Sequence, residues 1–262
     1  MEQGASIFTD QYLMIPWSIM VMSFGVALFA GFVKGLVGFA MPMIIISGLS
    51  SLMSPELALA GLILPTIVSN VWQALRQGLE AALESIRSFK VFLLVGGVVL
   101  AGSAQLVTVL SQSVLFLIIG IPVTMFAVMQ MLGWRFSLRE RTWQFDTGVG
   151  AFTGFIGGLS GVWGPPTVAY LTAVNTPKAE QVRVQGTIYG LGAVLLFFAH
   201  LKSGVLTSQT LQVSALLVPP AMVGIAIGFR VQDRVNQSVF RNVTLAVLCI
   251  AGVNLIRKGL LG

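Results

Sequence analysis

The chain has 262 residues, of which 56% are apolar and only 9% carry a charged side chain, and its formal net charge at pH 7 is +6. Roughly 25% of the residues in an ordinary soluble domain are charged, so this composition excludes a water-soluble globular protein. The basic residues lie in short segments between apolar runs, not in one stripe, which argues against a nucleic-acid partner.

The N-terminus carries Glu2 and Asp10 and no basic residue before the first apolar run. It therefore lacks the positively charged start of a secretory signal, and we expect the first helix to remain in the protein. Cys249 is the only cysteine, so thiolate metal clusters and internal disulfides are excluded. We expect no metal site and no cofactor.

Apolar runs close to the roughly 20 residues that cross a bilayer recur along the whole chain. In chain order they are Trp17–Val33, Leu57–Leu75, Phe92–Leu110, Val114–Leu132, Gly186–Leu201, Leu211–Phe229 and Val239–Ile256. The sequence therefore predicts an all-α polytopic membrane protein with no soluble domain between its helices.

A glycine-rich segment occurs twice. Gly31–Pro42 reads GFVKGLVGFAMP and Gly154–Pro165 reads GFIGGLSGVWGP, so an offset of 123 (154 − 31) makes six of twelve positions identical. Each copy is followed by a proline-containing break and then a long helix. We infer a duplication, with an N-terminal repeat at residues 1–133, a cytoplasmic linker at 134–146 and a C-terminal repeat at 147–262, all within one membrane domain.

Each repeat is predicted to contain a pair of short, broken helices followed by three long transmembrane helices. The short pairs are Trp17–Val33 with Phe39–Leu52, and Thr147–Leu159 with Trp163–Val174. The sequence leaves open whether a pair crosses the membrane twice or is re-entrant. In either case each repeat crosses an odd number of times, so the two repeats have inverted topologies.

The distribution of basic residues supports this topology independently. One side receives ten, which are Arg76, Arg87, Lys90, Arg135, Arg139, Arg141, Lys178, Arg230, Arg234 and Arg241. The other side receives only Lys202, Arg257 and Lys258. Because basic residues favour the cytoplasmic side, both termini are predicted to lie on the opposite, outer side of the membrane.

Corresponding breaks in two inverted repeats indicate a substrate site near the membrane midplane. Glycine lets a ligand approach the backbone, and the N-terminus of the helix after each break suits an anion. The candidate substrate-binding residues lie in the breaks or on the helices that follow them: Lys34, Gly35, Gly38, Asn70, Gln73, Gly158, Ser160, Gly161, Trp163, Arg183, Gln185 and Tyr189. The breaks themselves are marked by Pro42, Pro165 and Pro166.

Each candidate has a simpler alternative. The glycines also suit close helix packing, and any one polar residue also suits an interhelical hydrogen bond. Lys34 either faces the substrate or extends to the cytoplasmic interface, and Arg183 either binds substrate or faces the headgroups. His200, the only histidine, either couples protons or forms an interfacial hydrogen bond.

The paired motifs Gly35-Leu36-Val37-Gly38-Phe39 with Pro42, and Gly158-Leu159-Ser160-Gly161 with Pro165-Pro166, resemble those of the TauE/SafE sulfite exporter family, also called the 4-toluenesulfonate uptake permease family. The resemblance covers essentially the whole chain. It implies transport of sulfite, sulfonates or related sulfur-containing oxyanions across the bacterial inner membrane, with both termini periplasmic and substrate between the two breaks. We expect a secondary transporter of the sulfite, sulfonate or sulfoacetate type, with a proton or sodium ion as the coupling ion or with none. The sequence departs from the family pattern at Phe39-Ala40 and at the bulky Trp163, which leaves the particular substrate open.

The alternatives to a transporter are an anion channel and an intramembrane enzyme. An anion channel can share the inverted-repeat architecture, and flux measurements distinguish it, because a carrier saturates and a channel does not. An intramembrane enzyme needs paired carboxylates or a histidine beside a carboxylate, whereas this chain offers one histidine and dispersed acids. We therefore expect the chain not to be an enzyme.

Overall fold

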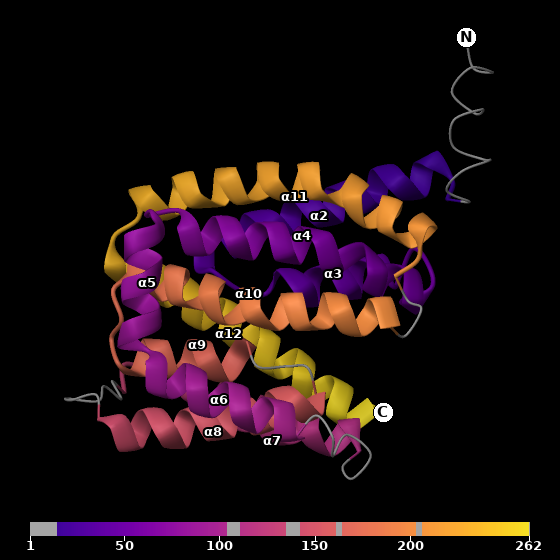
Figure 1. Cartoon of the computed structure of the whole chain (residues 1–262). Coiled ribbons are helices and arrows are strands. Elements are labelled where there is room, and N and C mark those ends of the chain that lie inside the picture. Colours follow the sequence, from indigo (N-terminus) through magenta and orange to yellow (C-terminus); the bar gives the residue numbers. More distant parts are fainter. Residues whose placement is uncertain (1–14, 104–110, 135–141, 161–163, 203–205, 262) are drawn as a thin grey trace. The chain divides into compact units, whose positions relative to one another are not determined.

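The computed structural model describes residues 15–103, 111–134, 142–160, 164–202 and 206–261 (Figure 1). Within these ranges the regular structure consists of helices alone. They are α2 (Trp17–Val37), α3 (Met41–Leu49), α4 (Pro55–Leu75), α5 (Leu79–Ser88), α6 (Lys90–Ser103), α7 (Gln112–Met131), α8 (Trp143–Ser160), α9 (Gly164–Ala173), α10 (Lys178–Lys202), α11 (Ser208–Arg234) and α12 (Gln237–Leu261).

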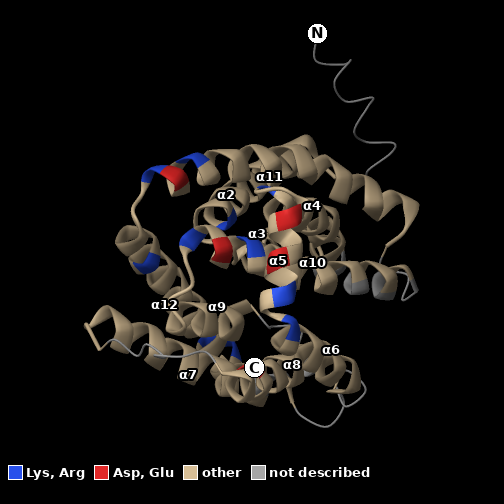
Figure 2. Cartoon of the chain, turned by 60° about the vertical axis from the view of Figure 1, so that its left-hand side comes forward, with Lys and Arg blue, Asp and Glu red and all other residues tan. Residues whose placement is uncertain are grey.

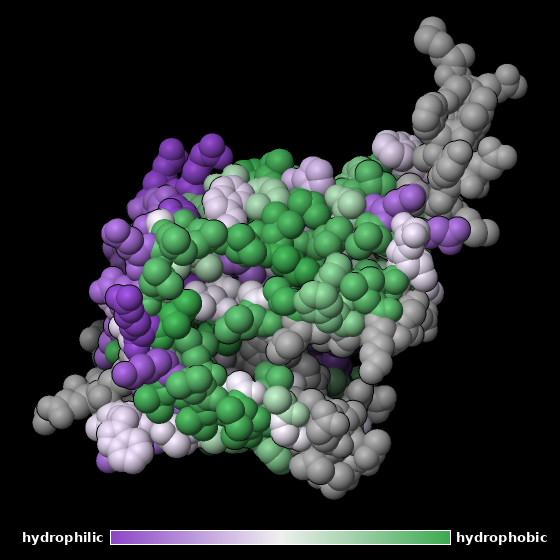
Figure 3. Space-filling model, in the orientation of Figure 1, coloured by the Kyte–Doolittle hydropathy of each residue, from purple (hydrophilic) through white to green (hydrophobic). Residues whose placement is uncertain are grey.

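Four of the described helices are long and apolar enough to cross a membrane: α2, the Leu57–Leu75 part of α4, α11 and α12. Helices α5 and α6 meet the same criterion together, as a pair bent by 74°. The predicted helical, multi-pass membrane protein is thereby confirmed. Figure 3 shows hydrophobic side chains over much of the visible faces of α11 and α6, whereas hydrophilic ones gather at the left edge, beside α5 and at the end of α11.

The helices form two compact units, and each unit combines segments from both halves of the sequence. The first unit comprises residues 1–74 and 186–234, and the second comprises residues 75–185 and 235–262. The segments of the two units thus alternate along the chain, and neither proposed repeat coincides with one unit. The division of the sequence into repeats remains a prediction.

In the first unit α2 and α11 run parallel and side by side (Figure 1). The two helices approach closely because glycine has no side chain at the points of contact. Gly31 lies against the backbone of Ala221, and Gly224 lies against that of Leu28. In the second unit α6 and α8 form the corresponding parallel pair, where a Cβ added to Gly96 would lie 3.2 Å from the carbonyl oxygen of Gly150. Small residues at such crossings let helix backbones approach without a hydrophobic driving force.

Helices α7 and α12, both in the second unit, run antiparallel. Gly120 packs on Gly252, whereas Leu117, nearer the start of α7, packs on Gly259, nearer the end of α12. A Cβ added to Gly120 would lie 2.9 Å from the carbonyl oxygen of Gly252. Each of these helices is the last one of its proposed repeat.

The helix boundaries follow the offset of 123 found in the sequence. Helix α2 ends at Val37 and α8 at Ser160 (37 + 123 = 160). Helix α3 begins at Met41 and α9 at Gly164 (41 + 123 = 164), and α4 begins at Pro55 and α10 at Lys178 (55 + 123 = 178). The two halves therefore interrupt their helices at the same places.

The first member of each short pair is longer than predicted. Helix α2 has 21 residues, or about 31 Å, and passes through Lys34 and Gly35 to Val37. The prediction ended this helix at Val33 because the glycine-rich segment Gly31–Pro42 indicated a break. The helix continues because α11 packs on Gly35. The backbone of α11 at Ile225 and Gly228 leaves no room for a side chain at this position.

The second members are short, as predicted. Helices α3 and α9 have 9 and 10 residues, or about 14 and 15 Å, which is about half of a bilayer's hydrocarbon core. Helix α3 folds back along α2, since Gly48 packs against Val26. Helix α9 folds back along α8, since the Tyr170 hydroxyl donates a hydrogen bond to Asp146 Oδ1. Each pair is therefore one long helix followed by a half-length return.

Helix α4 contains Pro65, which has no N–H and leaves the Gly61 carbonyl without its helical partner. Ser214 of α11 compensates within the first unit. Its hydroxyl donates to the Gly61 oxygen at 3.3 Å and accepts from the Leu64 N–H at 3.0 Å. A buried serine thus satisfies the backbone where the helix is interrupted, as a lipid environment requires.

Candidate functional site

The break between α2 and α3 is formed by two residues with left-handed backbone conformations. Gly38 has φ 87° and closes α2 with a 2.6 Å hydrogen bond from its N–H to the Lys34 carbonyl, and Ala40 has φ 73°. Pro42 lies in the first turn of α3, and no side chain caps that turn. The N-terminus of α3 is therefore open, with the partial positive charge of a helix start.

Lys34 lies in the last turn of α2, one turn before the break and not within it. Its side chain is 1% exposed, and its Nζ donates a hydrogen bond to Asn70 Oδ1 of α4. In the described part of the chain no carboxylate lies within ion-pairing distance of this ammonium group. Lys34 therefore points into the first unit, and the alternative of extending to the interface is excluded.

Helix α4 directs three polar side chains toward this region, because Thr66, Asn70 and Gln73 are spaced four and three residues apart. All three are buried, and Gln73 Nε2 donates to the Gly38 carbonyl at 3.0 Å. Thr66 Oγ1 and Asn70 Nδ2 have no hydrogen-bond partner among the described residues. Such unsatisfied buried groups are costly and require an explanation.

This cluster of Lys34, Thr66, Asn70 and Gln73, the Lys34 cluster, lies away from the centre of its helices. Asn70 is five residues from the end of α4 at Leu75, or about 8 Å along the helix axis. The prediction that substrate binds near the midplane of the membrane stays a prediction. The cluster lies toward the ends of α2 and α4, because the lysine is in the last turn of α2.

Helix α10 adds two glycines beside the cluster in the first unit. A Cβ added to Gly190 would lie 3.6 Å from the Asn70 Cβ, and one added to Gly186 would lie 2.6 Å from the Ala74 nitrogen. Tyr189, between them, is also buried in this unit. These glycines let α10 approach the face of α4 that carries Asn70 and Gln73.

The remaining candidates lie elsewhere. Arg183, in the second unit, donates from Nε to Ser85 Oγ of α5 at 2.6 Å and also bonds Gln77, so its guanidinium is engaged with α5. Gln185 is fully buried, and it is the last residue of the chain segment 75–185 that belongs to the same unit. For Gly35, contact with α11 accounts for the absence of a side chain.

The second break is described only in part. Gly158 and Ser160 belong to the last turn of α8, and Pro165 and Pro166 are buried in the first turn of α9. Gly161 and Trp163 lie outside the described residues. Their proposed roles remain predictions.

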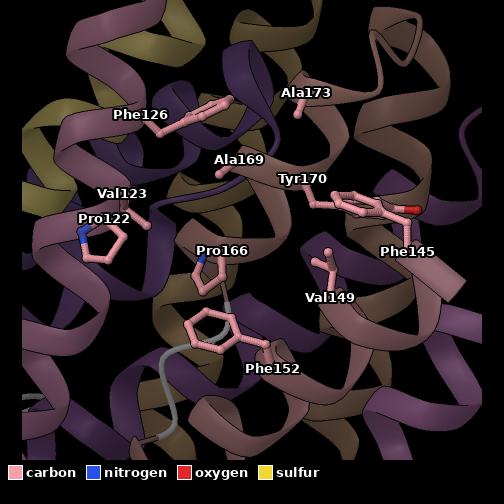
Figure 4. A pocket seen from close by; sticks show the side chains of 10 residues that line it. All are labelled: Pro122, Val123, Phe126, Phe145, Val149, Phe152, Pro166, Ala169, Tyr170 and Ala173. Carbon is pink, nitrogen blue, oxygen red and sulfur yellow. The ribbon is translucent and has the colours of Figure 1, made fainter. Parts of the chain in front are cut away.

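The α8–α9 pair borders an apolar cavity of about 420 Å³ (Figure 4). Its walls come from α7, α8 and α9: Pro122, Val123, Phe126, Phe145, Val149, Phe152, Pro166, Ala169, Tyr170 and Ala173. The Tyr170 ring stacks on Phe92 with centroids 5.1 Å apart, and its hydroxyl is directed to Asp146. No charged side chain lines this cavity, so it does not suit a small oxyanion.

A family model described as sulfite exporter TauE/SafE matches residues 23–255. The chain belongs to the sulfite exporter TauE/SafE family. No curated protein and no solved structure gives a significant match. The TauE/SafE match includes every candidate residue, and because this is a transporter family it agrees with the expectation that the chain is not an enzyme.

Two buried polar residues of this TauE/SafE protein were not selected from the sequence. Thr66 precedes Asn70 by four residues, and this helical spacing was the available signal. Asp146 was placed in the linker, because the prediction began the helix at Thr147. It is buried in the first turn of α8, which begins at Trp143.

Proposed function

We propose that the protein is a secondary transporter of small sulfur-containing oxyanions, of the sulfite, sulfonate or sulfoacetate type. It carries them across the bacterial inner membrane by alternating access. Membership of the TauE/SafE family supports a sulfur-containing anion as the substrate class. The coupling ion is a proton or sodium, or the substrate moves without one.

The observation that carries this proposal is the buried lysine. Lys34 has an amide oxygen as its partner and no carboxylate among the described residues, and a buried ammonium without a counter-ion is costly. An oxyanion beside Lys34 would supply the missing negative charge. It would also accept hydrogen bonds from Asn70 Nδ2 and the Thr66 hydroxyl, both of which lack partners.

The chemistry of the Lys34 cluster suits reversible binding. One charge-assisted hydrogen bond and two neutral ones hold an anion less tightly than several cations would. Gln73 supports the cluster indirectly, because its bond to the Gly38 carbonyl ties α4 to the break. The binding residues and the break would then move together when α2 and α4 change position.

Alternating access is supported by the arrangement of the repeats. Helix boundaries recur at the offset of 123, and the last helices of the two halves, α7 and α12, run antiparallel. Both features are expected of inverted repeats, in which one group of helices moves against another. Both termini are then periplasmic and the helix ends near Arg76 and Arg234 are cytoplasmic.

A thermal-shift screen tests the substrate class with purified protein. Sulfite, thiosulfate, sulfoacetate and taurine are compared with sulfate and with carboxylate analogues, because a ligand that binds the folded state raises the melting temperature as its concentration exceeds its Kd. We expect stabilisation by sulfite or a sulfonate that is lost in Lys34→Met. Absence of any stabilisation by these anions, or an undiminished shift in Lys34→Met, would contradict the proposal.

Flux into proteoliposomes tests the mechanism. A carrier shows saturable uptake and counterflow of labelled substrate, whereas a channel gives large currents that follow the electrochemical gradient. We expect saturation and counterflow. Imposed proton and sodium gradients, applied separately, then identify the coupling ion.

A further inference from the structure

Helix α5 was not expected from the sequence, which predicted a cytoplasmic loop between Arg76 and Lys90. It is a ten-residue helix with three faces of different chemistry. The face formed by Ala82 and Ser85 is buried against the protein. An apolar stripe is exposed at Leu79, Leu83 and Ile86, with exposed fractions of 64%, 41% and 41%. A charged face is formed by Glu80, Glu84 and Arg87, which are all exposed.

The rotation of α5 about its axis is set by its inner face. Arg183 of α10 donates a 2.6 Å hydrogen bond to Ser85 Oγ, and it also bonds Gln77 just before the helix. At 3.6 residues per turn, the centre of the apolar stripe lies about 120° around the helix from Ser85. The stripe therefore points sideways from the buried side that Arg183 holds, and the charged face lies opposite that side.

The direction of α5 differs from that of a membrane-spanning helix. The axes of α5 and α6 differ by 74° at the single residue Phe89 between them, and Figure 1 shows the bend. Spanning helices tilt by about 20° from the bilayer normal on average. A helix nearly perpendicular to α6 therefore runs close to the membrane plane.

Exposed apolar side chains flank the stripe on both sides along the chain. Helix α6 exposes Leu94 and Val98 at 68% and 72%, and Leu75 at the end of α4 is 44% exposed. The charged face beside the stripe carries both signs (Figure 2), which suits the zwitterionic headgroup layer. Amphipathic helices with this division of faces lie in the interface, with the apolar face about 5–10 Å into the boundary between headgroups and acyl chains.

We propose that α5 is an interfacial helix whose partner is the bilayer surface. Leu79, Leu83 and Ile86 lie among the outer acyl carbons, and the charged face lies in the headgroup layer. This inference rests on the multi-pass membrane fold and not on the identity of the substrate.

Helix α5 also distinguishes the two halves of the chain. Between α10 and α11, the corresponding pair in the second half, only residues 203–207 are available, which is too few for a helix of this length. The interfacial helix is therefore an addition to the first half alone. It anchors the connection between α4, which carries Asn70, and α6 at the membrane surface.

Site-directed spin labelling tests the proposal directly. Since Cys249 is the only cysteine, Cys249→Ser gives a background for single cysteines in the full chain. Labels are placed on the stripe through Leu83→Cys and Ile86→Cys and on the charged face through Glu84→Cys, in phosphatidylcholine vesicles. Val98→Cys on α6 is the lipid-facing reference, and each variant is checked for an unchanged melting temperature.

Accessibility to oxygen and to a water-soluble nickel chelate reports the depth of each label. We expect a several-fold higher ratio of oxygen to nickel accessibility at Leu83 and Ile86 than at Glu84, and an intermediate depth relative to Val98. Equal ratios at Leu83 and Glu84 would place α5 in water and overturn the proposal. Immobile labels at Leu83 and Ile86 with low access to both reagents would mean that protein covers the stripe, which overturns it equally.

Discussion

The two helical hairpins α2–α3 and α8–α9 share a backbone plan and differ in chemistry. Each consists of a long helix and a half-length return, with boundaries that correspond at the offset of 123. The first hairpin carries Lys34, and Asn70 faces it from α4. The equivalent positions of the second half are Gly157 and Ala193 (34 + 123 = 157; 70 + 123 = 193), and its hairpin borders an apolar cavity.

The difference distinguishes residues that shape the backbone of both hairpins from polar residues that occur beside only one of them. The glycines and prolines that recur in both hairpins maintain close packing and the interruption of the helices. The cation occurs in the first hairpin only, and the amide faces it from α4, so the proposed anion binding would be an addition to the shared plan. If this holds, anion binding and transport depend on the hairpin that carries Lys34, whereas the free energy of unfolding depends on both hairpins.

The largest effect is expected from Lys34→Met. Loss of a charge-assisted hydrogen bond, worth about 1.5–3 kcal/mol, should weaken anion binding roughly 10- to 150-fold. The ligand-free protein should melt at a higher temperature, because a buried charge is replaced by an apolar chain of similar length. Lys90→Met, at an exposed position, should change neither quantity. Equal losses of binding in both variants would remove Lys34 from the site.

The next effect is expected from valine at the breaks. Gly38→Val places a β-branched side chain at φ 87°, which costs about 1–3 kcal/mol and displaces the carbonyl that accepts from Gln73. Transport should be lost in protein that still inserts and folds, and Gly161→Val should have the same effect. Gly25→Ala is the control, because open space surrounds that glycine on α2. Normal uptake by both valine variants would exclude a role for the breaks in transport.

A smaller effect is expected from Ser214→Ala. The Gly61 carbonyl and the Leu64 N–H would lose their side-chain partner beside Pro65, at a cost of about 1–3 kcal/mol in the free energy of unfolding. Ser23→Ala is a matched control, since this buried serine bonds the carbonyl of Ile19 within its own helix. Thermal unfolding should separate the two variants, and equal melting temperatures would show that Ser214 does not support α4.

The smallest effect is expected from Tyr170→Phe. The change removes the hydrogen bond to the buried Asp146 and keeps the stacked ring, so stability should fall by about 1 kcal/mol. The midpoint of anion binding should not move, because this residue belongs to the apolar hairpin. A binding loss comparable to that of Lys34→Met would assign the α8–α9 pair to the substrate site.

The membrane-spanning segments and the corresponding helix interruptions were predictable because they depend on local composition and spacing. The Lys34 cluster was predictable in part: Lys34, Gly38, Asn70 and Gln73 are brought together, whereas Arg183 is engaged with α5. Helix α5 was missed because its charges suggested a loop. Leu79, Leu83 and Ile86, spaced four and three residues apart, were the signal that would have predicted it.

The sequence alone determined that the chain is a helical membrane protein with duplicated interruptions, since a bilayer leaves few structures open to such an apolar chain. Tertiary structure decided the direction of the Lys34 side chain, the continuation of α2 through Gly35 and the exchange of segments between the two units. All three features depend on which helices pack against each other in the folded protein. Glycines four residues apart, such as Gly31 and Gly35, indicate that a helix can pack closely, but their spacing does not identify the helix that lies against them.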